Sequence, residues 1–173
     1  ISRPDQYVGV TTYSGNSGDD LSTTQDIDVG LNPDLIWIKH RNGTNSNLLT
    51  DTVRGLPNTL ISNSTAATNT NASRIPALID NGFRVGDRNE VNDVGGNYVA
   101  WCWKAGGNKN TFNVDDVGYA TAAAAGLDGG DLTVTGASVG TKQGFSIIKY
   151  TGSGNAGDSA SHGLLEAPNF IIT

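Results

Sequence analysis

The sequence predicts an all-β fold, an antiparallel β-sandwich or jelly roll. Apolar and polar residues alternate with a period of two in short blocks, and no long stretch shows the periodicity of a helix. Turn signals such as Ser-Gly, Asn-Gly, Gly-Gly and Asn-Pro separate the blocks, and the chain contains 23 glycines. Short strands joined by many polar turns are typical of a sandwich.

The predicted strands are rich in β-branched and aromatic residues, and turn-forming residues bound each one. In chain order they are 7–13 (YVGVTTY), 34–40 (DLIWIKH), 47–51 (NLLTD), 59–63 (TLISN), 75–79 (IPALI), 82–86 (GFRVG), 97–104 (NYVAWCWK), 131–135 (DLTVT) and 144–151 (GFSIIKYT). The alanine run at 122–125 is too short for a stable helix, so we expect it to form a single turn.

Part of the chain is repeated. When Tyr150 is aligned on Tyr13, IIKYTGSGNAGD matches VTTYSGNSGDD. When Pro168 is aligned on Pro33, APNFII matches NPDLIW. The sequence therefore predicts that a second copy of the first unit starts near the C-terminal end.

This repeat predicts three segments. Residues 1–106 form a first β-sandwich unit, 107–143 a Gly- and Ala-rich connection with a short strand, and 144–173 the first strands of a second unit. The chain does not begin with Met and contains none, so we expect a segment of a longer protein. Either the longer chain completes the second unit, or 144–150 and 169–173 complete another sheet, in this subunit or in a neighbour. The second alternative gives strand donation and a head-to-tail fibre.

Charge and composition argue against several partners. The net charge is -6 and the 11 Lys and Arg residues are scattered, so no basic stripe is available to neutralise phosphates. No apolar run is long enough to span a bilayer. Cys102 is the only cysteine and has no partner for an intrachain disulfide. The sequence thus predicts no nucleic-acid partner and no membrane insertion.

Catalytic motifs are weak, and we expect no enzyme. Glycoside hydrolysis needs two carboxyl groups flanking one bond, but the only glutamates, Glu90 and Glu166, lie far apart in predicted loops. GASVG at 136–140 has the form of a nucleophile motif, yet a strand is predicted after it instead of a helix. GSGNAG at 152–157 also lacks the following helix that would hold a phosphate.

Acidic loops offer the only candidate metal ligands. Calcium prefers several oxygen ligands from loops, and paired carboxylates occur in three loops of the sequence, Asp19/Asp20, Asp115/Asp116 and Asp128/Asp131. No EF-hand or Gly-Gly-x-Gly-x-Asp array is present, so we predict no cofactor, with a structural calcium as the alternative. Its candidate ligands are Asp115, Asp116, Asp128 and Asp131.

The tryptophans are predicted to fill the core. In 97–104, alternation places Trp101 and Trp103 on one face and Cys102 on the other. Both faces are apolar, which is typical of a central strand buried on both sides. Ile172 stands in place of Trp37 in the second copy, an exchange that suits a core position better than a sugar platform. We therefore assign Trp37, Trp101, Trp103 and Cys102 to the core, with carbohydrate stacking by the tryptophans as the alternative.

The ordered succession of segments resembles a known family. The segments are NPDLIWIKHRN, LLTDTVRG, TLISNSTAATN, DNGFRVGD, NYVAWCWKAGG, DDVGYATAAAAGLDGG and GFSIIKYTGSGNAG. This string resembles the tandem repeat domains of unknown function in tail-fibre and other structural proteins of marine bacteriophages, which belong to the concanavalin A-like lectin/glucanase sandwich group. The resemblance implies a virion protein that works outside the cell, and it carries over no catalytic residue.

We therefore expect a non-enzymatic structural module of a phage virion, within a tail fibre or appendage. Its expected partners are copies of itself, other virion proteins and a host-surface glycan. A self-assembling fibre or capsid-cementing repeat without a ligand is the alternative, and a glycan-cleaving enzyme is a third. Carbohydrate contact combines aromatic faces with planar polar groups. The polar loop residues assigned to it are His40, Arg41, Asn42, Asp19, Asp20, Asp87, Arg88 and Asn89.

Overall fold

The computed structural model describes residues 3–17 and 23–173 of the chain. These residues form β-strands with a few single helical turns, which confirms the predicted all-β class. The chain divides into two compact units, Arg3–Lys104 and Ala105–Thr173.

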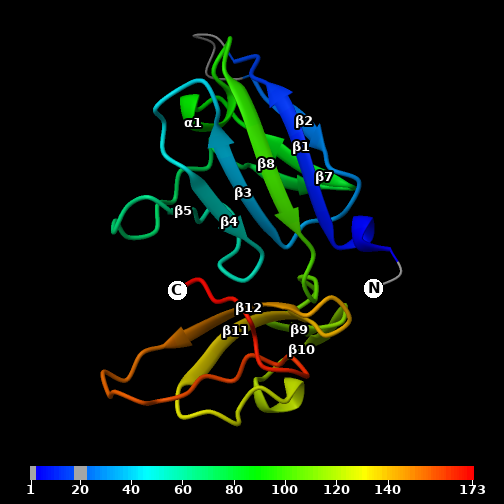
Figure 1. Cartoon of the computed structure of the whole chain (residues 1–173), viewed down its shortest axis with the longest axis vertical. Helices are drawn as coiled ribbons and strands as arrows, with labels where there is room; N and C mark the ends of the chain where they lie inside the picture. Colours follow the sequence, from blue (N-terminus) through cyan, green and yellow to red (C-terminus); the bar gives the residue numbers. More distant parts are fainter. Residues whose placement is uncertain (1–2, 18–22) are drawn as a thin grey trace. The chain divides into compact units, whose positions relative to one another are not determined.

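The larger sheet of the first unit has five strands, all paired antiparallel to their neighbours. The central strand is β8, which lies between β1 and β3 (Figure 1). The strands in sheet order are β1 (Val8–Ser14), β8 (Asn97–Trp103), β3 (Leu35–His40), β4 (Leu48–Asp51) and β5 (Leu60–Ile61).

A smaller sheet lies behind the larger one in Figure 1 and supplies the opposite wall of the core. Its strands in order are β2 (Gln25–Asp28), β7 (Gly82–Val85) and β6 (Ala77–Ile79). Ile27 from β2 and Phe83 from β7 share one buried cluster with Ile36 and Ile38 from β3. Burying one such side chain stabilises the fold by about 1.5–3 kcal/mol.

Alternation along each strand determines which residues enter this core. On β8, Tyr98, Ala100 and Cys102 are buried, whereas the residues between them are only half-buried. The short helix α1 (Asn89–Asn92) contributes the fully buried Val91, and the 3-10 turn η1 (Pro4–Gln6) precedes β1. The core of the first unit therefore lies between the two sheets, on one face of β8 only.

The second unit contains one four-stranded sheet. Its strands in order are β10 (Val117–Tyr119), β9 (Phe112–Val114), β11 (Thr133–Gly140) and β12 (Phe145–Thr151). β9 and β11 are parallel, while the other two pairs are antiparallel. The buried cluster of this unit contains Phe112, Leu127, Val134, Ala137 and Val139.

The sequence predicted residues 107–143 to be a connection with a short strand, and this prediction was wrong. They contain β9, β10 and β11, which belong to the same sheet as β12. β9 and β10 are too short to show a clear alternation, and their turn uses Asp115 and Asp116 at positive φ (48° and 66°) without the glycine that usually marks it. The strand expected at 169–173 is not formed, since that segment has no regular structure. The turn expected at 122–125 is present as η2 (Ala123–Ala125).

No helix among residues 3–17 and 23–173 is long and apolar enough to cross a membrane.

Candidate functional site: an outward tryptophan face and a polar loop end

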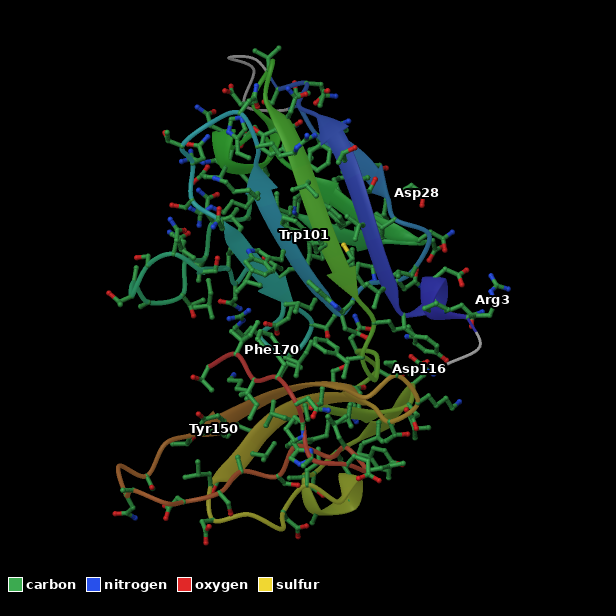
Figure 2. The ribbon with its side chains drawn as sticks, in the orientation of Figure 1. Arg3, Asp28, Trp101, Asp116, Tyr150 and Phe170 are labelled. Carbon is green, nitrogen blue, oxygen red and sulfur yellow. The ribbon has the colours of Figure 1, made fainter. Side chains whose placement is uncertain are left out.

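The three tryptophans lie on the outer face of the five-stranded sheet, which corrects their assignment to the core. Trp37, Trp101 and Trp103 are half-buried and alternate with the core residues of their strands. Figure 2 shows Trp101 on the face of β8 that points away from β2 and β7. The smaller sheet covers only the opposite face, so these side chains form an outward surface within their unit.

Trp37 and Trp101 form the centre of this surface. They are directly paired across β3 and β8, and their ring centroids lie 5.6 Å apart with a tilt of 51°. Tilted aromatic pairs at this distance are stabilised by about 0.5–1.5 kcal/mol beyond the area that they bury. The indole nitrogen of Trp37 is buried and has no hydrogen-bond partner in the described part of the chain.

Aliphatic side chains surround the tryptophan pair. Val10 is paired with Trp101 on one side of β8, and Leu49 is paired with Trp37 on the far side of β3. Val8 and Val10 belong to the edge strand β1 and are 45% and 60% exposed. We call this surface the tryptophan face, and its residues are Val8, Val10, Leu35, Trp37, Leu49, Val99, Trp101 and Trp103.

Polar groups lie at both ends of the tryptophan face. At one end, Lys39 extends from β3 and its Nζ donates to the carbonyl of Asn45 (3.1 Å). At the other end, the buried carboxylate of Asp51 is ion-paired with Arg54 and accepts its backbone N–H (2.7 Å). An apolar aromatic centre with a polar rim is the usual anatomy of a protein interface.

Cys102 lies on the opposite side of β8 from the tryptophans, in the core, and is fully buried. Burial raises the pKa of its thiol to about 12. The thiolate needed for a nucleophile or metal ligand is therefore not formed at neutral pH, and the side chain serves as a small apolar group.

His40, expected at a ligand-contacting position, is instead buried with an exposed fraction of 5%. Its ring stacks on Tyr98 with centroids 4.5 Å apart, and Tyr98 stacks on Tyr13. The amide of Asn45 lies 2.8 Å from Nδ1 of His40. Burial raises the pKa of Tyr98 to about 12, and the Tyr98 hydroxyl donates to the carbonyl of Asn89 (2.7 Å). This stack fixes the sheet end and leaves the imidazole little room for a ligand.

The loops that contain the other predicted contact residues meet at this end of the sandwich. Asn42 donates to the carbonyl of Gly95 and accepts the backbone N–H of Asn97. Asn45 donates to the carbonyl of Asn89 at 3.0 Å. The structure therefore brings together two loops that are about 45 residues apart in the sequence.

Arg41, Arg88 and Asn89 are exposed at the same loop end, and Asp87 is half-buried. The backbone N–H of Arg41 donates to the carbonyl of Asn97. Asp19 and Asp20 lie outside the described residues.

A buried ion pair supports the second loop. Arg74 is 6% exposed, and its Nη2 donates to Glu90 Oε1 at 2.9 Å. Burial raises the pKa of Glu90, but the hydrogen bond from Arg74 and the charges of Arg74 and Arg88 outweigh it, so the net pKa lies below the usual range.

Two of the four candidate calcium ligands, Asp115 and Asp131, accept hydrogen bonds from neighbouring groups. Asp115 accepts the backbone N–H and the hydroxyl of Thr141 (2.8 and 2.6 Å), and Asp131 accepts both donors of Ser159. These hydrogen bonds hold the pKa of Asp131 below its usual range. In the described part of the chain, no group of three or more His, Cys, Asp or Glu side chains is arranged to hold a metal ion. Asp115, Asp116, Asp128 and Asp131 are thus not gathered into one such group among the described residues.

Ser138 of the GASVG motif and Glu90 are both held by hydrogen bonds within their own units. Ser138 lies in β11 and is fully buried, where its hydroxyl donates to the carbonyl of Gly107 and accepts the N–H of Gly106. Glu90 is in the first unit and is paired with Arg74, whereas Glu166 is an exposed residue of the second unit.

Fold and surface together define an all-β protein whose first unit is an antiparallel sandwich with an outward aromatic sheet face. The chain belongs to the family described as Domain of unknown function (DUF7483), whose profile matches residues 3–173. No curated protein and no solved structure matches the chain.

Proposed function

We propose that the chain is a non-enzymatic structural module of a bacteriophage virion, within a tail fibre or similar appendage. The tryptophan face would dock on a second copy of the chain. The resemblance of the ordered sequence segments to phage repeat domains supports the setting. The single observation that supports docking is the Trp37–Trp101 pair on a sheet face that the smaller sheet leaves uncovered.

The composition of the face favours a protein partner over a sugar. Sugar stacking needs hydrogen-bonding side chains beside the aromatic ring, but the strand neighbours of Trp37 and Trp101 are Leu49 and Val10. Tryptophans surrounded by aliphatic side chains are the usual energetic centre of a protein interface. Contiguous exposed apolar surface of this kind marks an interaction site in a stable protein.

Sedimentation velocity over a concentration series tests this proposal, with Trp37→Ser compared with a control on the same unit. Val94 is 64% exposed, so Val94→Ser removes an apolar side chain away from the face. We expect the unmodified protein and Val94→Ser to associate, and Trp37→Ser to associate at least about tenfold more weakly, since an interface hot spot is worth 2 kcal/mol or more. Equal association of Trp37→Ser and the unmodified protein would contradict the proposal.

Glycan adhesion is a second candidate, supported by the loop end. The bonds from Asn45 to Asn89 and from Asn42 to Gly95 join two polar loops that present Arg41 and Arg88 to solvent. Glycan-array binding by the folded protein, lost in an Arg41→Ala/Arg88→Ala variant and kept in Trp37→Ser, would support this candidate. Absence of binding by the unmodified assembly would reject it.

A further inference from the structure

The C-terminal segment 165–173 carries a cluster of exposed apolar side chains. Leu165, Phe170, Ile171 and Ile172 are 81%, 80%, 67% and 60% exposed. The preceding residue Leu164 still packs against the core of the second unit. After Leu164 the segment therefore holds its apolar groups in solvent, which is costly unless a partner covers them.

The internal repeat identifies the kind of structure that this segment is made for. With Tyr150 aligned on Tyr13, the bounds of β12 (Phe145–Thr151) coincide with those of β1 (Val8–Ser14). The sequence repeat thus places a strand at the same aligned positions in both copies, β1 in the first and β12 in the second. Because the first repeated strand agrees in structure, we also compare the next repeated stretch, APNFII, with its counterpart NPDLIW.

With Pro168 aligned on Pro33, Phe170, Ile171 and Ile172 correspond to Leu35, Ile36 and Trp37 of β3. In the first unit Ile36 is 2% exposed and paired on both sides, to β8 and to β4. In the second unit Ile171 has no strand partner among the described residues. The segment therefore has the sequence of a sheet strand and is unpaired among the described residues.

Side-chain parity indicates how the segment would enter a sheet. Leu35 and Trp37 point to the outer tryptophan face and Ile36 to the core. The same parity directs Phe170 and Ile172 to one face and Ile171 to the other, because successive residues of a strand alternate.

β1 provides a matching acceptor. It lies at the end of the five-stranded sheet and, among residues 3–17 and 23–173, is paired only with β8, so one edge of its seven residues has no strand partner there. Val8 and Val10 on this strand belong to the tryptophan face and are exposed. A strand added beside β1 would place Phe170 and Ile172 next to these valines and extend the apolar face by one strand. Such edge addition gives main-chain hydrogen bonds together with side-chain specificity.

We propose that residues 168–173 of one copy add as an antiparallel strand to the open edge of β1 in a second copy. The donor and acceptor surfaces differ, so the contact is head to tail and leaves one free donor and one free acceptor on every assembly. The inference rests on the self-association in the proposed function and supplies a geometry for it. Repetition of the contact yields a chain of modules.

Two single variants test the two sides of this contact. Ile171→Asp puts a charge at the inward position of the donor, and Leu165→Asp puts the same charge in the same segment outside the strand-like residues. Val10→Lys blocks the acceptor edge, since lysine on an edge strand opposes pairing, and Val94→Lys is its matched control. In sedimentation velocity we expect Ile171→Asp and Val10→Lys to lose at least about tenfold in association, and both controls to associate as the unmodified protein does.

Mixing the two defective variants gives a decisive result. Ile171→Asp retains an intact β1, and Val10→Lys retains an intact donor segment, so one functional contact remains per pair. We expect the mixture to form a 1:1 dimer that does not grow. Hydrogen exchange should show new protection of amides in Val8–Ser14 of the Ile171→Asp partner only.

Unchanged association of Ile171→Asp, or a mixture that remains monomeric, would overturn the strand-addition proposal. An unmodified protein that stays monomeric would overturn it as well, because the proposed strand addition joins two copies of the chain. Val10→Lys alters the tryptophan face as well as the edge of β1, so the two proposals are separated by Ile171→Asp, which lies outside that face, and by Trp37→Ser, which lies two strands from the edge of β1.

Discussion

Trp37 and Trp101 are directly opposite each other on β3 and β8. Their ring centroids lie 5.6 Å apart on the side of the sheet that faces away from the core. The neighbouring residues Ile36 and Cys102 are also paired with each other, but on the inner side. One step along each strand thus separates a surface pair from a core pair. This difference gives the first prediction.

Trp101→Ala should destabilise the protein less than Ile36→Ala, although it removes the larger side chain. Truncation of a buried isoleucine leaves a cavity and costs about 2–5 kcal/mol. Trp101 loses only half-buried contacts, and we expect a cost below about 2 kcal/mol. Urea unfolding of the two variants measures both values, and a larger loss for Trp101→Ala would place this side chain in the core.

Cys102 should be unreactive toward thiol reagents in the folded protein at pH 8, because its pKa of about 12 leaves the thiol protonated and it is fully buried. Full reaction is expected in denaturant. Val10→Cys in the same protein supplies an exposed thiol that should react quickly under native conditions. Rapid native labelling of the unmodified protein would contradict the assigned position.

Glu90→Gln should destabilise the protein by about 1–3 kcal/mol at pH 7, because the buried Arg74 loses its charged partner. The folded-state pKa of Glu90 lies below its ordinary value of 4.5. Its contribution is therefore fully present above pH 4.5 and is lost as the pH falls through the folded-state pKa. The difference in unfolding free energy between the unmodified protein and Glu90→Gln should shrink below pH 4.5 in a urea series. A difference that grows on acidification would have the wrong sign.

Asp115→Ala should destabilise the second unit by about 1–2 kcal/mol through the loss of its hydrogen bonds to Thr141. Asp115→Asn keeps an acceptor and a side chain that tolerates positive φ, so a smaller loss is expected. Addition of Ca²⁺ should leave the thermal midpoints of all three proteins unchanged, since the carboxylate is engaged by Thr141. A rise in midpoint with Ca²⁺ that is lost in Asp115→Ala would restore the calcium alternative.

Strands with a strong period-two pattern were predictable from the sequence, and β2, β9 and β10 were not. β2 reads QDID, in which only Ile27 enters the core while Asp26 is exposed and ion-paired with Arg84 of β7. Such a strand is recognised by its cross-strand partner, which local sequence does not reveal. Of the contact residues, His40 follows the inward parity of Ile36 and Ile38, so alternation alone would have placed it inside.

The all-β class and most strands follow from the sequence, because alternation and turn residues are local properties of the chain. The sequence also contained the repeat that aligns β12 with β1. Tertiary structure alone decided which side of β8 is the core. Both faces of that strand are apolar, so their sequences read alike, and only the packing of the β2–β7–β6 sheet buries Cys102 and leaves Trp101 outside.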